Sequence, residues 1–229
     1  MKNIAVLTGA GISAESGIKT FRDSDGLWEN HDVMEVASVE GFLKNPELVL
    51  RFYNERRRQA RACQPNPGHL ALVALEEKYH VNIVTQNVDD LHEKAGSTHV
   101  LHLHGMLNKS RSIANKKIIY DIEGDISIGD KAPDGHQLRP HIVWFGEDVP
   151  LIFKAADMFE AADIVIIIGT SLAVYPASNL YTYASADCPL YVIDPNIPKL
   201  PSKRDVTYIQ ENASVGVPRL VTQLLAAAE

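Results

Sequence analysis

The chain has 229 residues, and its 45% hydrophobic and 22% charged content is typical of a globular protein with a sizeable core. Its net charge of −7 argues against a nucleic-acid partner, because neutralising phosphates requires clustered Lys and Arg, and Arg56 to Arg58 is the one local exception. No apolar run reaches membrane-spanning or signal-peptide length, so we expect a cytoplasmic protein without a membrane partner. Two cysteines, Cys63 and Cys188, are too few for a disulfide framework or a four-cysteine metal site.

Short β-branched runs alternate with helical patterns along most of the chain. Strands are expected at residues 4–7, 81–85, 100–103, 164–168 and 190–193. Asn45-Pro46 and Asn66-Pro67 each open a predicted helix, and Gly96 closes the helical segment 89–95. This alternation predicts an α/β fold built on a doubly wound, parallel, Rossmann-like sheet.

Two stretches do not fit the alternation. Residues 22–66 have a helical pattern and no strand, and residues 107–140 are polar and irregular. We expect both to be insertions that form a smaller lobe of a single domain, with residues 1–21, 67–106 and 141–229 forming the larger lobe. Ligands of such sheets bind beyond the carboxyl ends of the strands, so the residues just after each strand are the candidate site.

The first strand is followed by a glycine-rich loop. Gly9-Ala10-Gly11-Ile12-Ser13-Ala14 fits the G-x-G-x-x-G/A pattern of a backbone that approaches a pyrophosphate, although a tight strand-to-helix turn would explain the glycines equally well. A dehydrogenase also needs a second strand that ends in an acid about twenty residues later. Residues 21–28 read as a loop instead, so hydride transfer is not supported.

Polar residues follow the next two predicted strands. Gln86-Asn87-Val88-Asp89 supplies amides and a carboxylate that suit ribose hydroxyls and a carboxamide, although Asp89 could serve only as a helix cap. His102 and His104 share one strand face, and His104 stands at the strand end, where a group that titrates near neutrality can act as a general base. We interpret His102, which lies deeper, as a packing residue.

These motifs together resemble a known family. Gly9 to Ser13, Thr20 to Asp23, Gln86 to Asp89, Leu103 to Gly105 and Gly169 to Ser171 have the order and spacing of the sirtuins, and the resemblance covers nearly the whole chain. It implies an enzyme that consumes NAD to remove acyl groups from lysine, and its partners would be acylated-lysine proteins or peptides. The implied cofactor contacts are Gly9, Ala10, Gly11, Phe21, Arg22, Gln86, Asn87, Val88, Asp89, Gly169, Thr170, Ser171 and Asn196.

The resemblance also implies catalytic and substrate-binding residues. His104 would deprotonate a ribose hydroxyl after the acyl oxygen has displaced nicotinamide, giving O-acyl-ADP-ribose and free lysine, and Asn87 would be the second catalytic residue. The segment Arg139 to Glu147 resembles the substrate-binding segment of the family. Its residues Val143, Phe145, Gly146 and Glu147 would flank a peptide that pairs as an added strand.

The chain departs from the family pattern where most sirtuins place a four-cysteine zinc site. Residues 105–139 contain no cysteine and no ligand spacing typical of structural zinc. We therefore expect no metal, and a module held by Ile118, Ile119, Ile122 and Ile126.

Tyr53 and Arg56 lie three residues apart and so share one face of the predicted helix. A phenol and a guanidinium together suit a carboxylate. The pair, together with His141, resembles the sirtuin subgroup that removes succinyl and malonyl groups, with acetyl removal also expected. Without the family context, a core aromatic beside Phe52 and a solvated basic face shared with Arg57 and Arg58 would be favoured.

Two other functions share the same expected site. One is transfer of ADP-ribose to proteins, and the other is a non-catalytic sensor of NAD or ADP-ribose. The acyl pocket implied by Tyr53 and Arg56 favours deacylation over the first, and a sensor has no evident need for His104. The sequence predicts no particular oligomeric state.

The missing cysteines predict a protein without structural zinc. Elemental analysis of the purified protein should find zinc far below one equivalent per chain, because no thiolate ligands are available between residues 105 and 139. One full equivalent of tightly held zinc would contradict the prediction.

Overall fold

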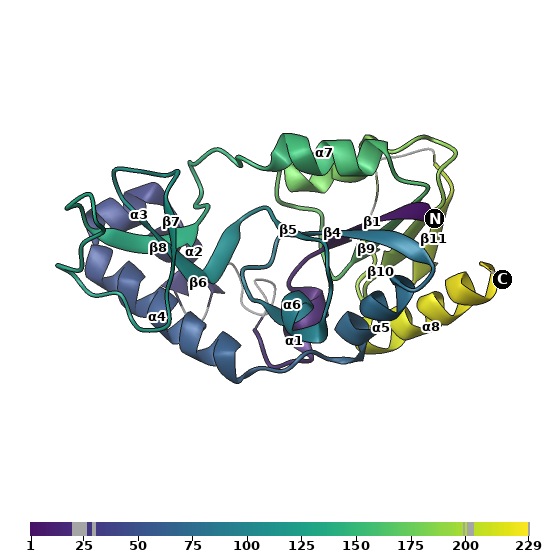
Figure 1. Ribbon diagram of the computed structural model, residues 1–229, viewed down its shortest axis with the longest axis horizontal. Helices are drawn as coiled ribbons and strands as arrows, with labels where there is room; N and C mark the ends of the chain where they lie inside the picture. Colours follow the sequence, from purple (N-terminus) through teal and green to yellow (C-terminus); the bar gives the residue numbers. More distant parts are fainter. Residues whose placement is uncertain (20–26, 29–30, 199, 201–203, 229) are drawn as a thin grey trace.

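The structure, a computed structural model, describes residues 1–19, 27–28, 31–198, 200 and 204–228. It has two lobes, each with its own sheet (Figure 1). The elements in chain order are β1 (Lys2–Thr8), α1 (Gly11–Ala14), β2 (Leu27–Trp28), β3 (His31–Asp32), α2 (Val33–Val36), α3 (Val39–Lys44), α4 (Pro46–Ala62), α5 (Pro67–Leu75), β4 (Tyr79–Thr85), α6 (Leu91–Ala95), β5 (Val100–His102), β6 (Gly105–Ser112), β7 (Ile119–Asp121), β8 (Leu138–Ile142), α7 (Ile152–Glu160), β9 (Ile164–Ile168), the 3₁₀ helix η1 (Ala177–Thr182), β10 (Leu190–Ile193), β11 (Val206–Ile209) and α8 (Ala213–Ala226). None of the described helices is long and apolar enough to cross a membrane.

The larger lobe is built on a six-stranded sheet in the order β11-β10-β9-β1-β4-β5, in which every pairing is parallel. This is the doubly wound Rossmann order, so the predicted fold class is confirmed. The five expected strands are all present, and β11 was not expected. Its Thr207 and Tyr208 are exposed, so this edge strand lacks the continuous apolar run that identifies a strand buried on both faces.

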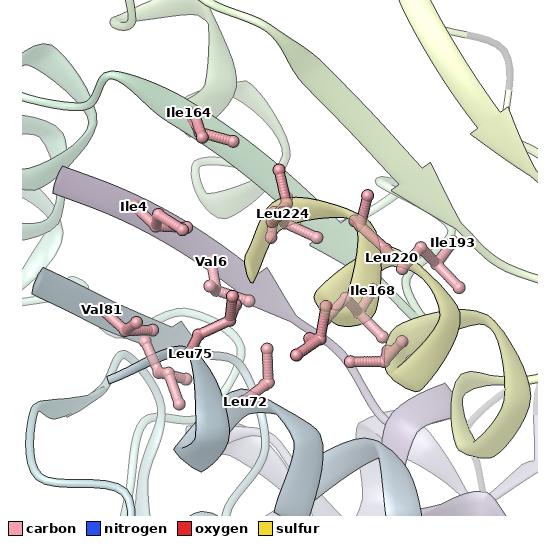
Figure 2. Close-up of a cluster of buried hydrophobic side chains, with 14 of the residues drawn as sticks. Ile4, Val6, Leu72, Leu75, Val81, Ile164, Ile168, Ile193, Leu220 and Leu224 are labelled. Atoms are coloured by element: carbon pink, nitrogen blue, oxygen red, sulfur yellow. The ribbon is translucent and has the colours of Figure 1, made fainter. Parts of the chain in front are cut away.

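Helices cover both faces of the sheet. Alternate residues of β1 point to opposite faces, so Ile4 and Val6 pack toward α5 and α8 whereas Ala5 and Leu7 pack toward α7 and η1. Figure 2 shows the first of these layers, with apolar side chains of α5 and α8 lying against the sheet. Asn45 and Asn66 cap α4 and α5, and Gly96 ends α6 with a left-handed φ of 107°, as predicted.

The first insertion forms the helical part of the smaller lobe. Helices α2, α3 and α4 enclose a core that includes Val36, Val49 and Phe52. The expectation of no strand here was wrong, because β2 and β3 form a two-stranded antiparallel pair. Each strand has only two residues, which is too short for an alternating pattern to be visible in the sequence.

The second insertion is more regular than expected. It forms a three-stranded antiparallel sheet in the order β7-β6-β8, which runs from residue 105 to residue 142. We expected four isoleucines to hold this module by packing in its interior. The prediction was wrong for Ile118 and Ile119, which are both 47% exposed. Ile122 is half-buried, and Ile126 alone of the four is fully buried.

Polar contacts from α4 attach this module to the helices. Arg57, which the alternative interpretation of Arg56 placed on a solvated basic face, is buried. It donates from Nε to the carbonyl of Leu107 at 2.6 Å and from Nη1 to that of Gly124 at 3.2 Å. Its Nη1 also donates to Asn54 Oδ1 at 2.8 Å, and Asn54 exchanges two 2.9 Å hydrogen bonds with the backbone of Ile126. Burial lowers the pKa of Arg57 to about 10, so it remains charged at neutral pH. The guanidinium and the amide therefore join α4 to the module.

Removing the guanidinium of Arg57 should destabilise the whole protein. Arg57→Met leaves the acceptors on Leu107, Gly124 and Asn54 short of a buried donor, so we expect a loss of about 3 kcal/mol of unfolding free energy. For a chain of this length that corresponds to a fall in Tm of roughly 6–12 °C, measurable by calorimetry.

Arg58→Met is the matched control. Arg58 is the next residue of α4, with a half-exposed side chain paired to the half-exposed Asp125, and such pairs contribute about 0–1 kcal/mol. Equal Tm shifts for the two variants would show that the buried contacts of Arg57 do not hold the module.

Candidate active site

A cleft of about 1180 Å³ lies where the loops after β1, β4, β9 and β10 face the smaller lobe. It opens where the strand order reverses between β1 and β9, the usual ligand site of this sheet type. The cleft is larger than the roughly 300–1,000 Å³ typical of small-ligand sites. Predicted site residues that line it are Gly9, Ala10, Gly11, Tyr53, Arg56, Gln86, Asn87, Val88, Asp89, His104, Val143, Phe145, Gly146, Glu147, Gly169, Thr170, Ser171 and Asn196. Phe21 and Arg22 lie outside the described residues.

The glycine-rich loop after β1 rests directly on the loop after β9. The Gly9 amide donates to the carbonyl of Ile168 at 3.0 Å, and the Gly11 amide donates to that of Gly169 at 2.8 Å. A Cβ on Gly11 would lie 2.6 Å from the Gly169 Cα, so no larger residue fits there. The close approach leaves the floor of the cleft without side chains at this point, which suits a pyrophosphate lying against backbone.

The loop after β4 is tied to its neighbours by side chains. Gln86 Nε2 donates to Thr170 Oγ1 at 3.1 Å. Asn87 Nδ2 donates to the carbonyl of Gly9 at 3.1 Å and to Ser13 Oγ at 3.2 Å. These bonds hold the β1, β4 and β9 loops together, so the two amides act as a framework for the cleft as well as part of its lining.

Asp89 lines the cleft and is not the N-cap of α6, because that position belongs to Asp90. Its carboxylate accepts the Leu91 backbone N–H at 3.1 Å, and a contact with a ligand stays a prediction. Burial raises the pKa of Asp89, against the lowering effect of its hydrogen bonds from Leu91 and Ser13.

His104 is placed as a neutral base. Its Nδ1 lies 3.1 Å from the carbonyl oxygen of Gln86, and because a carbonyl can only accept, Nδ1 carries the proton. The proton-free Nε2 is therefore the basic nitrogen. Burial lowers the pKa of His104, although the bond to Gln86 partly opposes this, so the ring is neutral at physiological pH.

His102 has the opposite electrostatic state. Its Nδ1 contacts the carbonyl of Asn87 at 3.0 Å, and its Nε2 contacts the carboxylate of Glu93 at 2.7 Å. Both partners accept, so the ring donates from both nitrogens. Burial lowers its pKa, but the hydrogen bond and charge of Glu93 outweigh burial and raise it overall. His102 is thus a buried structural cation, in agreement with its interpretation as a packing residue.

The smaller lobe contributes Tyr53 and Arg56 from one face of α4. Tyr53 is fully buried beside Phe52, and its hydroxyl oxygen accepts the indole N–H of Trp144 at 3.0 Å. Arg56 is 5% exposed, donates to Gln59 at 3.1 Å and lies 5.2 Å from the ring centroid of Trp28. A solvated basic face was therefore the wrong alternative for Arg56, because the core of the lobe covers the guanidinium.

The segment after β8 bridges the lobes. The Val143 amide donates to the carbonyl of His104 at 2.9 Å, the Phe145 amide donates to that of Ala37 at 2.8 Å, and the Val39 amide donates back to that of Phe145 at 3.3 Å. Backbone bonds thus fix this segment to His104 and to the smaller lobe, and Phe145 remains 41% exposed.

Glu147 lines the cleft, but its carboxylate is directed into the protein. It accepts from Arg111 at 2.8 and 3.0 Å, from Arg139 at 3.1 and 3.0 Å, and from the backbone amide of Trp144 at 3.0 Å. Although burial raises its pKa, Arg139 and these other contacts lower it to about 2. The carboxylate of Glu147 therefore supports the loop, and its contact with a peptide stays a prediction. His141, noted with the acyl-binding pair, lies on β8 and is not among the residues that line the cleft.

Several cleft residues were not among the site residues predicted from the sequence. Trp28, Ala37, Trp144 and Asp194 also line the cleft. Asp194 is a buried carboxylate directly after β10, a position that could have marked it by the same rule used for Asp89. Trp28 and Ala37 come from the smaller lobe, and only the folding of that lobe over the sheet reveals their position.

Neither cysteine lies in a cluster of metal-ligating side chains among the described residues. Cys63 at the end of α4 and Cys188 before β10 are both buried and free. No group of three or more His, Cys, Asp or Glu in the described ranges is arranged to hold a metal ion. Arg57 and Asn54 instead join the β6-β7-β8 module to α4.

The strand order and the glycine contact define a nucleotide-binding protein of the Rossmann type. A sequence model of the Sir2 family matches residues 9–176. A protein from Helicobacter pylori named NAD-dependent protein deacylase is 54% identical over 228 residues, which is 100% of both chains, and one of the same name from Bacteroides thetaiotaomicron is 49% identical, over 99% of this chain and 100% of its own. A Sir2 homologue solved as an NAD complex superposes with a TM-score of 0.89 at 36% identity, over 100% of this chain and 91% of its own. The chain belongs to the Sir2 family.

The environment of His104 predicts the pH dependence of activity. Only the neutral ring can accept a proton, and burial lowers the pKa of His104 from the ordinary 6.5, so the acidic limb of kcat/KM should be centred below pH 6.5. A pH profile of kcat/KM between pH 5 and 9 measures this. An acidic limb centred above 6.5 would instead indicate a histidine with a raised pKa, such as His102, as the essential base.

Proposed function

We propose that this protein is an NAD-dependent protein-lysine deacylase that prefers acidic acyl groups such as succinyl and malonyl. The carrying observation is that a neutral His104 and the pair Tyr53 and Arg56 line one cleft. Membership of the Sir2 family, and the names of the relatives from H. pylori and B. thetaiotaomicron, support NAD-dependent deacylation. The acidic preference rests on the two side chains of α4.

The cleft fits NAD as the consumed co-substrate. The side-chain-free contact between Gly11 and Gly169 gives the pyrophosphate a place against backbone, and Asp194 and Asn196 line the end of the cleft after β10, where the adenosine ribose is expected. Asn87 and Asp89 would line the nicotinamide pocket, beside His104. NAD supplies the bond between ribose and nicotinamide that the reaction breaks.

The residues of the chain have separable tasks in this reaction. Gln86 holds His104 in the tautomer whose Nε2 can take a proton from a ribose hydroxyl. Val143 and Phe145, fixed by backbone bonds to both lobes, would place the acylated lysine between the base and the acyl pocket. The products are nicotinamide, O-acyl-ADP-ribose and free lysine.

The acyl pocket is mostly apolar apart from its α4 pair. Trp28, Ala37 and Ile142 line the cleft together with Tyr53 and Arg56. An apolar surround strengthens the attraction between a guanidinium and a carboxylate, because less water screens it. Neither ADP-ribose transfer to proteins nor passive sensing of NAD requires a pocket for an acyl group, so we favour deacylation.

Substituting Arg56 should change the acyl preference. Arg56→Met keeps an unbranched side chain but removes the charge, so we expect kcat/KM on a succinyl-lysine peptide to fall about 100-fold, as for a lost charge-assisted contact. The loss of kcat/KM on the matching acetyl-lysine peptide should be about tenfold or less. Mass spectrometry of O-acyl-ADP-ribose measures both products directly.

Arg51→Met is the control, since Arg51 is an exposed arginine on the same helix α4 and outside the cleft lining. Its ratio of succinyl to acetyl activity should equal that of the parent. Equal losses on both peptides in Arg56→Met would defeat the acidic preference. Formation of ADP-ribosylated protein in place of O-acyl-ADP-ribose would defeat deacylation itself.

A further inference from the structure

We infer that Trp144 is a positioning residue for acyl selectivity. Its indole N–H donates a hydrogen bond to the hydroxyl oxygen of Tyr53. The hydroxyl proton of Tyr53 is then available to donate to the carboxylate of an acidic acyl group. The inference rests on the proposed function, and it adds to that function a residue that acts through Tyr53.

The direction of this hydrogen bond follows from the two groups. The indole nitrogen of Trp144 lies 3.0 Å from the Tyr53 oxygen, and indole can only donate, so the hydroxyl is the acceptor. Within the described part of the chain, the indole is the hydroxyl's only hydrogen-bond partner. Burial raises the pKa of Tyr53 well above its ordinary value, so the phenol keeps its proton at neutral pH. Both side chains line the cleft.

The indole is fixed in place from several sides. The guanidinium carbon of Arg139 lies 3.3 Å from the ring centroid of Trp144, and the Phe42 ring lies 5.0 Å away on a tilted plane. The backbone amide of Trp144 donates to Glu147, which Arg111 and Arg139 hold in turn. A ring held in this way cannot turn to release the Tyr53 oxygen without breaking these contacts.

This arrangement acts on only one class of substrate. A hydroxyl whose oxygen already accepts one hydrogen bond presents its proton as the available group, and a carboxylate is a strong acceptor for it. An acetyl group has no carboxylate at that position. The indole N–H should therefore affect acidic acyl groups much more than acetyl.

A double-mutant cycle tests whether Trp144 acts through Tyr53. The four proteins are the parent, Trp144→Phe, Tyr53→Phe and the double variant, and the quantity measured is the ratio of kcat/KM on succinyl-lysine and acetyl-lysine peptides. We expect Trp144→Phe to lower the ratio about tenfold, mainly through a higher KM for the succinyl peptide, as for one lost hydrogen bond to a charged group. In the Tyr53→Phe background the same substitution should change the ratio less than about twofold, because no hydroxyl is left to orient.

Phe42→Leu is the packing control, because it disturbs the surface against which the indole rests but keeps the N–H. Its two activities should change together. A tenfold fall in the ratio for Trp144→Phe in both backgrounds, or no fall in either, overturns the inference. A parent that does not prefer succinyl-lysine refutes the proposed function instead, and the two failures are therefore distinct.

If Trp144→Phe does not fold, the indole itself reports on the bond. The chain has two tryptophans, so the ¹⁵N-indole resonance of Trp144 is assigned by its survival in Trp28→Phe. We expect Tyr53→Phe to shift this resonance and to speed its hydrogen exchange. An unchanged resonance and exchange rate would overturn the inference without any activity measurement.

Discussion

Gly105 joins the six-stranded sheet to the three-stranded sheet, and its geometry determines where His104, the proposed general base, lies. The residue has a φ of +84°, and a Cβ there would lie 1.9 Å from the carbonyl oxygen of His141. Only glycine allows β6 to leave β5 and pair at once with β8. The neighbouring His104 is thereby held at the junction, with its ring bonded to Gln86 of the larger lobe and its carbonyl bonded to Val143 of the bridging segment.

The same junction explains the difference between the two nearby histidines. His102 ends β5, where the acid of α6 makes it a buried cation. His104, two residues later, lies in the turn between β5 and β6 and meets a backbone carbonyl instead. One residue is then suited to a structural ion pair and the other to proton transfer, although their side chains are identical.

In the smaller lobe, buried charge has a structural role. Arg57 joins α4 to the β6-β7-β8 module, and the pairing of Arg111 and Arg139 with Glu147 supports the segment above the cleft. Breaking such pairs is costly because the remaining charge stays buried. Tyr53 and Arg56, the proposed acyl-pocket residues, are on the same helix as Arg57, so the contacts that join α4 to the module also position this pair.

Local patterns in the sequence determined the parallel sheet, the helix caps at Asn45 and Asn66, the glycine loop and the position of His104 just after a strand, because strand ends and caps are set by neighbouring residues. Tertiary structure alone decided which polar residues are buried. Arg57, one of three consecutive arginines, is covered by a module more than 45 residues away, whereas Ile118 and Ile119 are exposed. Glu147 pairs with Arg111, which lies 36 positions away in the sequence. Trp144 is hydrogen-bonded to Tyr53, which lies 91 positions away. No local pattern encodes such contacts, because they exist only once the two insertions have packed against each other and against the segment after β8.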